Sequence, residues 1–265
     1  MPKIGVLVIH GVGGQGSGFY KPLRDELGER LGPLAHEVAW QPVYWAPVLQ
    51  HKEEALWKHV KDTGAVNQLA LRKFALKTAA DALSYRQTSR AGITVYSEIH
   101  DAVGEAVEQL HTRVPAGTGP TVVLAHSLGA QIMSDYIWDR QKGDSSRESI
   151  PDLVGFITFG CNLPLFAMAC TPPRPILVPD PSAGHQALAA WHNYYDPDDV
   201  LGWPLRPLYA PHLDELDERQ RQTVNLIQDR NINTGWIFGA HTGYWTDDDF
   251  TKPVASYLKQ VIEAV

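Results

Sequence analysis

The chain has 265 residues, of which 44% are hydrophobic, and a formal net charge of −7. This size can bury one large core, so we expect a single domain over residues 1–265, and the acidic balance argues against nucleic acid as the main partner because phosphate binding requires a basic face. No apolar run in the sequence is long enough to cross a bilayer, and the chain enters a strand pattern without the regions of a signal peptide, which predicts a soluble cytoplasmic protein.

The first predicted element is the continuous apolar run from Ile4 to His10, which is typical of a strand buried on both faces of a parallel sheet. A glycine-rich loop over residues 11–18 follows, and residues 20–31 have the pattern of a helix. Strand, loop and helix together predict a βα unit.

The glycine-rich loop admits two interpretations. Gly11, Gly13 and Gly16 satisfy the G-x-G-x-x-G spacing of dinucleotide-binding folds, but the acidic residue expected at the end of the next strand is absent, since that run ends at Tyr44-Trp45. The second interpretation is an oxyanion loop, in which the backbone N–H of Val12 faces a reacting carbonyl. We favour the oxyanion loop and keep an NAD(P)-binding oxidoreductase as the alternative.

Residues 38–45 predict the second strand, and residues 93–114 predict a long amphipathic helix. Between them, residues 48–90 are helix-like and longer than a crossover between parallel strands requires. We interpret them as an insertion, either a lid over the sheet edge or an extra packed helix pair. Their interleaved basic residues leave contact with a membrane surface as a third alternative.

The next stretch, residues 121–130, combines an apolar β run, the turn A-H-S-L-G and the start of a helix that ends near Gln141. A serine in such a turn, with small residues two before and two after, is the nucleophile elbow pattern. The small flanking residues are needed because the strand must reverse into a helix while the serine adopts a strained backbone. Ser127 is therefore the candidate nucleophile, with an ordinary helix N-cap as the alternative.

Further elements follow in the second half of the chain. We predict strands at 153–159, 188–195 and 223–228 and a final helix at 247–265. Residues 160–185 form a cap loop, because the density of proline over 162–181 is incompatible with a regular helix or a central strand.

A serine hydroxyl needs a base within hydrogen-bond reach and a carboxylate that orients the base. The chain offers these groups in the order Ser127, Asp199, His241, and His241 follows a predicted strand among small residues. Asp196 is the alternative acid, because strand alternation does not decide which carboxylate of the D-P-D-D loop turns inward. We favour Asp199, since the apolar Val200-Leu201 beside it should anchor that end of the loop.

Four motifs occur in this order: V-I-H-G-V-G-G, A-H-S-L-G, N-Y-Y-D-P-D-D-V-L-G and A-H-T-G-Y-W. Together they resemble the α/β-hydrolase superfamily, lipase and esterase branch, and locally the intracellular lipases and phospholipases of the DDHD kind. In the latter, the Asp before a Val-type residue is the triad acid, which implies Asp199. The chain departs from the pattern in carrying Ala125 for glycine and in lacking two leading antiparallel strands. The resemblance therefore implies an α/β-hydrolase fold with a mostly parallel sheet of about six strands flanked by helices.

These features predict a serine hydrolase that cleaves carboxylic esters through an acyl-enzyme, with the N–H groups of Val12 and Leu128 as the oxyanion hole. Such a mechanism requires no cofactor or metal. The expected partner is a small-molecule ester with an apolar acyl or alkyl part. A catalytically silent α/β-hydrolase used as a binding module remains a further alternative, and the oligomeric state is left open.

Overall fold

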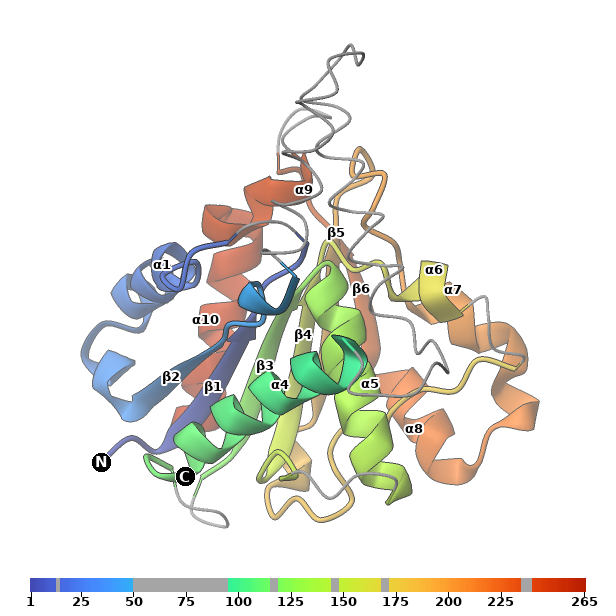
Figure 1. Ribbon diagram of the computed structural model, residues 1–265, viewed down its shortest axis with the longest axis horizontal. Coiled ribbons are helices and arrows are strands. Elements are labelled where there is room, and N and C mark those ends of the chain that lie inside the picture. Colours follow the sequence, from blue (N-terminus) through green and yellow to red (C-terminus); the bar gives the residue numbers. More distant parts are fainter. Residues whose placement is uncertain (13–14, 50–94, 115–118, 144–147, 168–171, 235–239) are drawn as a thin grey trace.

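The computed structural model describes residues 1–12, 15–49, 95–114, 119–143, 148–167, 172–234 and 240–265. In this part of the chain, six strands form one parallel sheet in the order β2-β1-β3-β4-β5-β6 (Figure 1). The strands are β1 (Ile4–Ile9), β2 (Val38–Val43), β3 (Thr121–His126), β4 (Leu153–Phe159), β5 (Ala190–Tyr195) and β6 (Ile227–Asn231). The predicted α/β architecture with about six parallel strands flanked by helices is thus confirmed.

Helices cover both faces of the sheet. Helices α4 (Val95–His111) and α5 (Leu128–Lys142) lie on the face turned to the viewer in Figure 1, and α1 (Lys21–Leu31) and α10 (Asp248–Glu263) pack together on the other. Successive strand residues point to opposite faces. Val6 and Val8 therefore join the core under α1 and α10, whereas Leu7 joins the core under α4 and α5. Burial on both faces explains why the central strands β1, β3 and β4 are almost continuously apolar.

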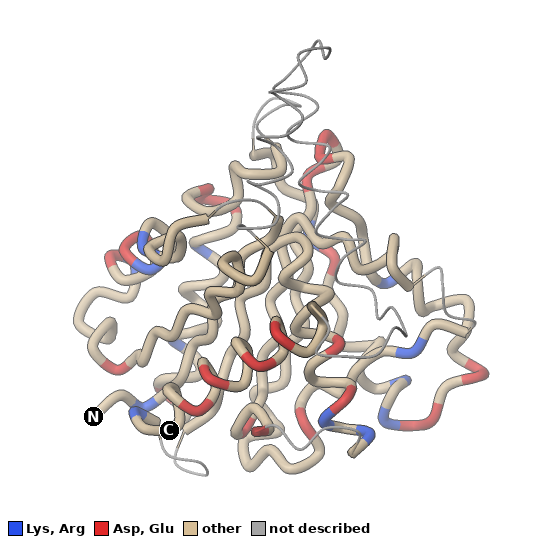
Figure 2. Tube along the Cα trace, in the orientation of Figure 1, with Lys and Arg blue, Asp and Glu red and all other residues tan. Residues whose placement is uncertain are grey.

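Helix α4 illustrates how the sequence pattern selects the buried face. Ile99, Val103 and Leu110 are fully buried against the sheet. On the opposite side, acidic residues follow one another at helical spacing and form the row of red segments along α4 in Figure 2; they are Glu98, Asp101, Glu105 and Glu108. This division between an apolar and a charged face is what the period of an amphipathic helix predicts.

Short helices connect the later strands. They are α6 (Leu163–Ala167), α7 (Arg206–Tyr209) and α8 (Glu218–Leu226), with 3₁₀ turns at Gln186–Leu188 and Ala210–Glu215. After the last strand come α9 (Ala240–Gly243) and a 3₁₀ turn at Tyr244–Thr246, and a further 3₁₀ turn, Gly32–Glu37, lies between α1 and β2.

Two predictions in this region were wrong. The last strand begins at Ile227 rather than Thr223, because residues 218–226 form α8, which starts with a capping box between Asp217 and Gln220. The proline-rich segment does contain one helical turn, α6, in which Pro164 occupies the first turn, where a missing N–H costs nothing.

The predicted cap loop, 160–185, has a described course except at residues 168–171. The loop leaves the carboxyl end of β4 at Gly160 and reaches the amino ends of the strands. There the N–H of Asp180 donates to the carbonyl of Leu153, the first residue of β4. Its second half therefore runs away from the carboxyl edge of the strands.

The predicted lid insertion, residues 48–90, lies outside the described residues from position 50 onward. Among the residues that the structure does describe, no helix is both long and apolar enough to cross a membrane.

Candidate active site

All predicted site residues lie beyond the carboxyl ends of parallel strands. Strand β3 leads into Ser127, β5 leads into the loop that holds Asp196 and Asp199, and His241 follows β6 in the short helix α9. Because parallel strands end at the same edge of a sheet, segments far apart in the sequence meet there. In Figure 1 this edge is the upper one, where α9 lies.

The turn at Ser127 has the geometry that the elbow pattern predicts. Its backbone is at φ 52° and ψ −126°, a positive-φ conformation that non-glycine residues rarely adopt. The N–H of Ser127 donates to the carbonyl of Phe159 at 3.1 Å, which ties the turn to the end of β4. A Cβ atom at Gly129 would lie 2.6 Å from the carbonyl oxygen of His10, so the second flanking position has room only for glycine.

Ser127, His241 and Asp199 form one continuous chain of hydrogen bonds. The Oγ of Ser127 lies 2.8 Å from Nε2 of His241, and Nδ1 of His241 lies 2.9 Å and 3.0 Å from the two carboxylate oxygens of Asp199. Ser127 and Asp199 are almost completely buried, while the His241 side chain keeps 14% of its surface exposed. The predicted nucleophile, base and favoured acid are thus brought together.

The environment of Asp199 favours its ionised form. Burial alone would raise the pKa of this carboxyl, but the hydrogen bonds from His241, the backbone N–H of Leu201 and the hydroxyl of Tyr244 together hold the pKa below its usual value. An ionised carboxylate at this position accepts the Nδ1–H of His241 and leaves Nε2 free to accept the proton of Ser127.

We expected Val200-Leu201 to anchor the acid loop; this was wrong for Val200, whose side chain is 76% exposed, while Leu201 is half-buried. Backbone hydrogen bonds hold part of the loop. The N–H of Trp203 donates to the carbonyl of Cys161 at 2.9 Å, and the N–H of Asp199 donates to the carbonyl of Asp196 at 3.0 Å.

Asp196, the alternative acid, is buried but serves a different segment. One of its oxygens accepts the N–H of Asp198, as in an Asx turn, and the other accepts the N–H of Thr234 at 2.6 Å. The hydroxyl of Thr234 also lies 2.7 Å from the carbonyl of Ala240, the residue before His241. Asp196 therefore connects the acid loop to the segment that leads to His241, without contacting the imidazole itself.

Two further histidines are buried beside the triad. His126 precedes Ser127, and its Nε2 lies 2.7 Å from the carbonyl oxygen of His241. His10 precedes the glycine loop, and its Nδ1 lies 2.7 Å from the carbonyl oxygen of Gly11. Burial lowers the pKa of His126 to about 3, with the His241 ring adding to the effect, and burial lowers the pKa of His10 to about 4. Both imidazoles are therefore neutral at pH 7.

The two predicted oxyanion donors lie next to Ser127 in the chain fold. Leu128 is the first residue of α5, and the first N–H groups of a helix have no acceptor within the helix. Val12 follows Gly11, where an added Cβ would lie 2.5 Å from Cβ of Ser127. Because a trans peptide is planar, binding of the Gly11 carbonyl by His10 turns the Val12 N–H in the opposite direction.

Residues that the sequence reasoning missed complete the site. Tyr244 is fully buried and contacts both the Asp199 carboxylate and the backbone of Asp196. Gly160 and Gly202 lie against the same group of side chains. Thr234 holds the approach to His241. Two of the quoted motifs contain such residues: A-H-T-G-Y-W places Tyr244 three positions after His241, and N-Y-Y-D-P-D-D-V-L-G places Gly202 three positions after Asp199.

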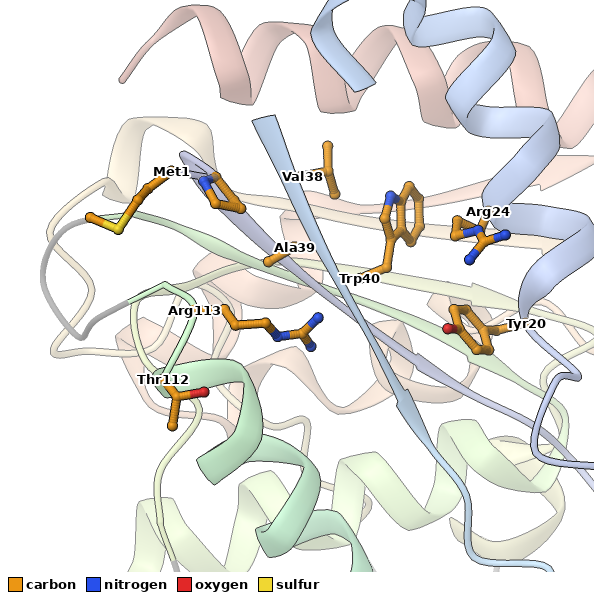
Figure 3. A pocket seen from close by; sticks show the side chains of 9 residues that line it. Met1, Tyr20, Arg24, Val38, Ala39, Trp40, Thr112 and Arg113 are labelled. Atoms are coloured by element: carbon orange, nitrogen blue, oxygen red, sulfur yellow. The ribbon is translucent and has the colours of Figure 1, made fainter. Parts of the chain in front are cut away.

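Several hollows lie on the described surface. One of about 520 Å³ lies over the edge strand β2, between Tyr20 and Arg24 on one side and Arg113 on the other (Figure 3). Another, of about 260 Å³, lies between α5 and α6. The second shares α5 with the candidate nucleophile, whereas the first does not involve the elbow.

Comparison of the sequence with models of known families and with curated protein sequences found no match. The assignment of function therefore depends on the side chains at the carboxyl edge of the sheet.

Proposed function

We propose that this protein is an α/β-hydrolase that cleaves carboxylic esters with Ser127 as nucleophile. The observation that carries the proposal is the hydrogen-bond chain from Ser127 through His241 to Asp199, in which the serine sits at a positive-φ turn between a strand and a helix. A serine that serves only as an N-cap would bond a backbone N–H of the helix, and Ser127 has no such side-chain bond.

The mechanism follows from the roles of the three groups. His241 removes the hydroxyl proton as Oγ of Ser127 attacks the ester carbonyl, and the alcohol leaves with the proton that His241 returns. Water then attacks the acyl-enzyme with His241 again as base, which regenerates Ser127. In both steps the N–H groups of Leu128 and Val12 stabilise the negative charge on the carbonyl oxygen.

The spacing around the glycine loop does not favour the dinucleotide-binding alternative. In that motif the helix opens directly within the glycine run, so that the pyrophosphate lies at its N-terminus. Here α1 begins at Lys21, five positions after Gly16, and Gly11 lies against Ser127. A silent binding module is also disfavoured, because it has no need for the aligned proton path from Ser127 to Asp199.

The hollow of about 260 Å³ between α5 and α6, called the groove below, favours an ester with an apolar chain as the substrate. Gln131, Ser134 and Trp138 line it at positions 4, 7 and 11 after Ser127, a spacing that places them on one side of α5. The facing wall includes Leu163 and Phe166 of α6. We therefore propose that the apolar part of the substrate extends from Ser127 along this groove.

A fluorophosphonate probe provides the test. We expect it to label Ser127, and we expect Ser127→Ala to lose labelling and to reduce hydrolysis of a p-nitrophenyl acyl ester by about 10⁴-fold or more, with an unchanged fold. Ser182→Ala, at an exposed serine, is the control and should behave as the natural protein does. Undiminished hydrolysis by Ser127→Ala would refute the proposal. Failure to label together with saturable NADH binding would support the dinucleotide alternative.

A further inference from the structure

Tyr244 is a buried phenol whose hydrogen bonds have a defined direction. Its hydroxyl lies 2.9 Å from the backbone nitrogen of Asp196 and 2.8 Å from Oδ2 of Asp199. A backbone N–H can only donate, so the hydroxyl accepts from Asp196. Its single proton is then donated to Asp199. Burial, and the adjacent charge of Asp199, raise the pKa of Tyr244, so the proton is retained across the physiological pH range.

The two oxygens of Asp199 are held from different sides. Oδ1 accepts the backbone N–H of Leu201 at 3.0 Å, and Oδ2 accepts the hydroxyl of Tyr244 at 2.8 Å. These two bonds fix the plane of the carboxylate. The edge that remains between the two oxygens faces Nδ1 of His241, which lies at 2.9 Å and 3.0 Å from them. Without the phenol, the contact with His241 is the one hydrogen bond that the described residues leave to Oδ2.

Two glycines make room for this arrangement. A Cβ at Gly202 would lie 2.6 Å from Oδ2 of Asp199 and 3.0 Å from the hydroxyl of Tyr244. A Cβ at Gly160, whose φ is +54°, would lie 3.0 Å from the Tyr244 ring and 3.3 Å from Cε1 of His241. The side chains of Tyr244, Asp199 and His241 therefore pack so closely against Gly160 and Gly202 that a methyl group on either glycine would displace them.

From these contacts we infer that Tyr244 is a positioning residue of the proposed hydrolase: its hydroxyl joins the Asp199 carboxylate to the backbone of Asp196 and so holds the carboxylate in the plane that receives Nδ1–H of His241. This inference rests on the proposed function. Tyr244 acts through Asp199 and contacts no reacting atom.

The inference has a consequence for the pH dependence. In the part of the chain that the structure describes, the titratable groups around Tyr244 are Asp196 and Asp199 of the acid loop, His126 of the elbow and His241 of α9. Of these, the Asp199–His241 pair must be without an added proton for Ser127 to react. The donated hydrogen bond of Tyr244 is one of the groups that lower the pKa of Asp199. Loss of this hydrogen bond favours uptake of a proton by the Asp199–His241 pair. The acidic limb of the pH profile for Ser127 reactivity then moves to higher pH.

The experiment compares Tyr244→Phe with Tyr257→Phe. Tyr257 is a suitable control because it is also buried and its hydroxyl donates to a backbone carbonyl, that of Leu188, at 2.9 Å. The rate of fluorophosphonate labelling is measured from pH 4 to pH 9, with thermal unfolding of each variant. We expect Tyr244→Phe to lower the rate at pH 7 by about tenfold and to move the acidic limb to higher pH. Tyr257→Phe should lose stability only.

Each other outcome is decisive. If the natural protein is labelled and Tyr244→Phe keeps both the rate and the acidic limb, the inference is wrong while the proposed function stands. If the natural protein is not labelled, both are wrong. If Tyr244→Phe fails to fold, Gly202→Ala is used instead, because its added methyl group would disturb the hydrogen bond between Tyr244 and Asp199. An unchanged pH profile of labelling in Gly202→Ala would likewise overturn the inference.

Discussion

The imidazole of His126 lies with Nε2 2.7 Å from the carbonyl oxygen of His241, so the residue before the proposed nucleophile holds the backbone of the proposed base. A neutral imidazole that donates from Nε2 satisfies this carbonyl. The two rings lie 4.9 Å apart. The elbow and the histidine segment are thus fixed relative to each other by a contact separate from the reactive one.

Two substitutions of His126 test whether its hydrogen bond, rather than its size, positions His241. We expect His126→Gln, whose amide can reach the same carbonyl, to keep labelling of Ser127 within about threefold. His126→Phe fills the space without a donor and should lower the rate by about 10- to 100-fold, because a buried carbonyl is left unsatisfied and His241 is displaced. Equal labelling rates in the two variants would show that the hydrogen bond does not position His241.

The two buried aspartates should respond differently to the same change. Asp199→Asn removes the charge that orients and stabilises the imidazole, so ester hydrolysis should fall by about 10³- to 10⁴-fold. Asp196→Asn weakens the contact with Thr234 and should lower the free energy of unfolding by about 1–3 kcal/mol. Its rate should remain within about tenfold. The reverse order of rates would identify Asp196 as the acid.

Ala125 is the position at which the elbow departs from the common pattern. It is fully buried in β3, where it pairs with Ile9 of β1 and Thr158 of β4. Ala125→Gly should cost about 1–2 kcal/mol of stability, through a lost methyl group and greater freedom of the unfolded chain, and should retain labelling of Ser127. A folded but unreactive Ala125→Gly protein would contradict the proposed turn geometry.

The buried histidines predict a loss of stability in mild acid. Burial lowers the pKa of His10 to about 4 and that of His126 to about 3, from 6.5. Below pH 6.5 the unfolded chain binds protons that the folded protein does not, so the free energy of unfolding falls by about 1.4 kcal/mol per pH unit for each histidine.

Urea unfolding of the natural protein and of His10→Asn, between pH 7 and pH 5, measures this slope. Asparagine can replace the Nδ1 donor but does not titrate, so the variant should show a smaller slope. The carboxyl of Asp199 contributes little in this range, because its lowered pKa places the loss of its contribution at more acidic pH. Identical slopes would indicate that His10 is not buried in its neutral form.

If the apolar chain of the substrate lies in the groove between α5 and α6, obstruction of this groove should change the preference for acyl chain length. Ser134 is only 9% exposed and lines the groove, so Ser134→Phe should obstruct it. Relative to the natural protein, we expect kcat/KM for p-nitrophenyl decanoate to fall by about tenfold more than kcat/KM for the acetate. Ser182→Phe, at an exposed serine, is the control. An equal decrease with both esters would place the apolar chain elsewhere.

Most of the fold could be predicted because strands buried on both faces leave a strong signal. The apolar runs that form β1, β3 and β4 are of this kind. The strand predicted at 223–228 failed because Thr223 and Val224 have strand preferences, while Asp217 and Gln220 set a helix start six residues earlier. That capping box is visible in the sequence and would have corrected the boundary.

The candidate site was predictable only in part, for a related reason. Ser127, Asp199 and His241 each belong to a short motif, but the role of Tyr244 depends on a contact with Asp199 across 45 positions. No local pattern encodes such a contact. Likewise, Asp196 and Asp199 are both followed by turn residues, and the partners that distinguish them, Thr234 and His241, lie far away in the sequence.

The reactivity that we propose for Ser127 would also report on folding. Ser127 and His241 are 114 positions apart, and Gly11 approaches Ser127 from the opposite end of the chain. Helices such as α4 form from local contacts, whereas this arrangement requires long loops to close first. During refolding, the appearance of probe-reactive serine therefore marks the completion of tertiary structure. A covalent label applied at successive times would record that final step for one atom, independently of the recovery of helical signal.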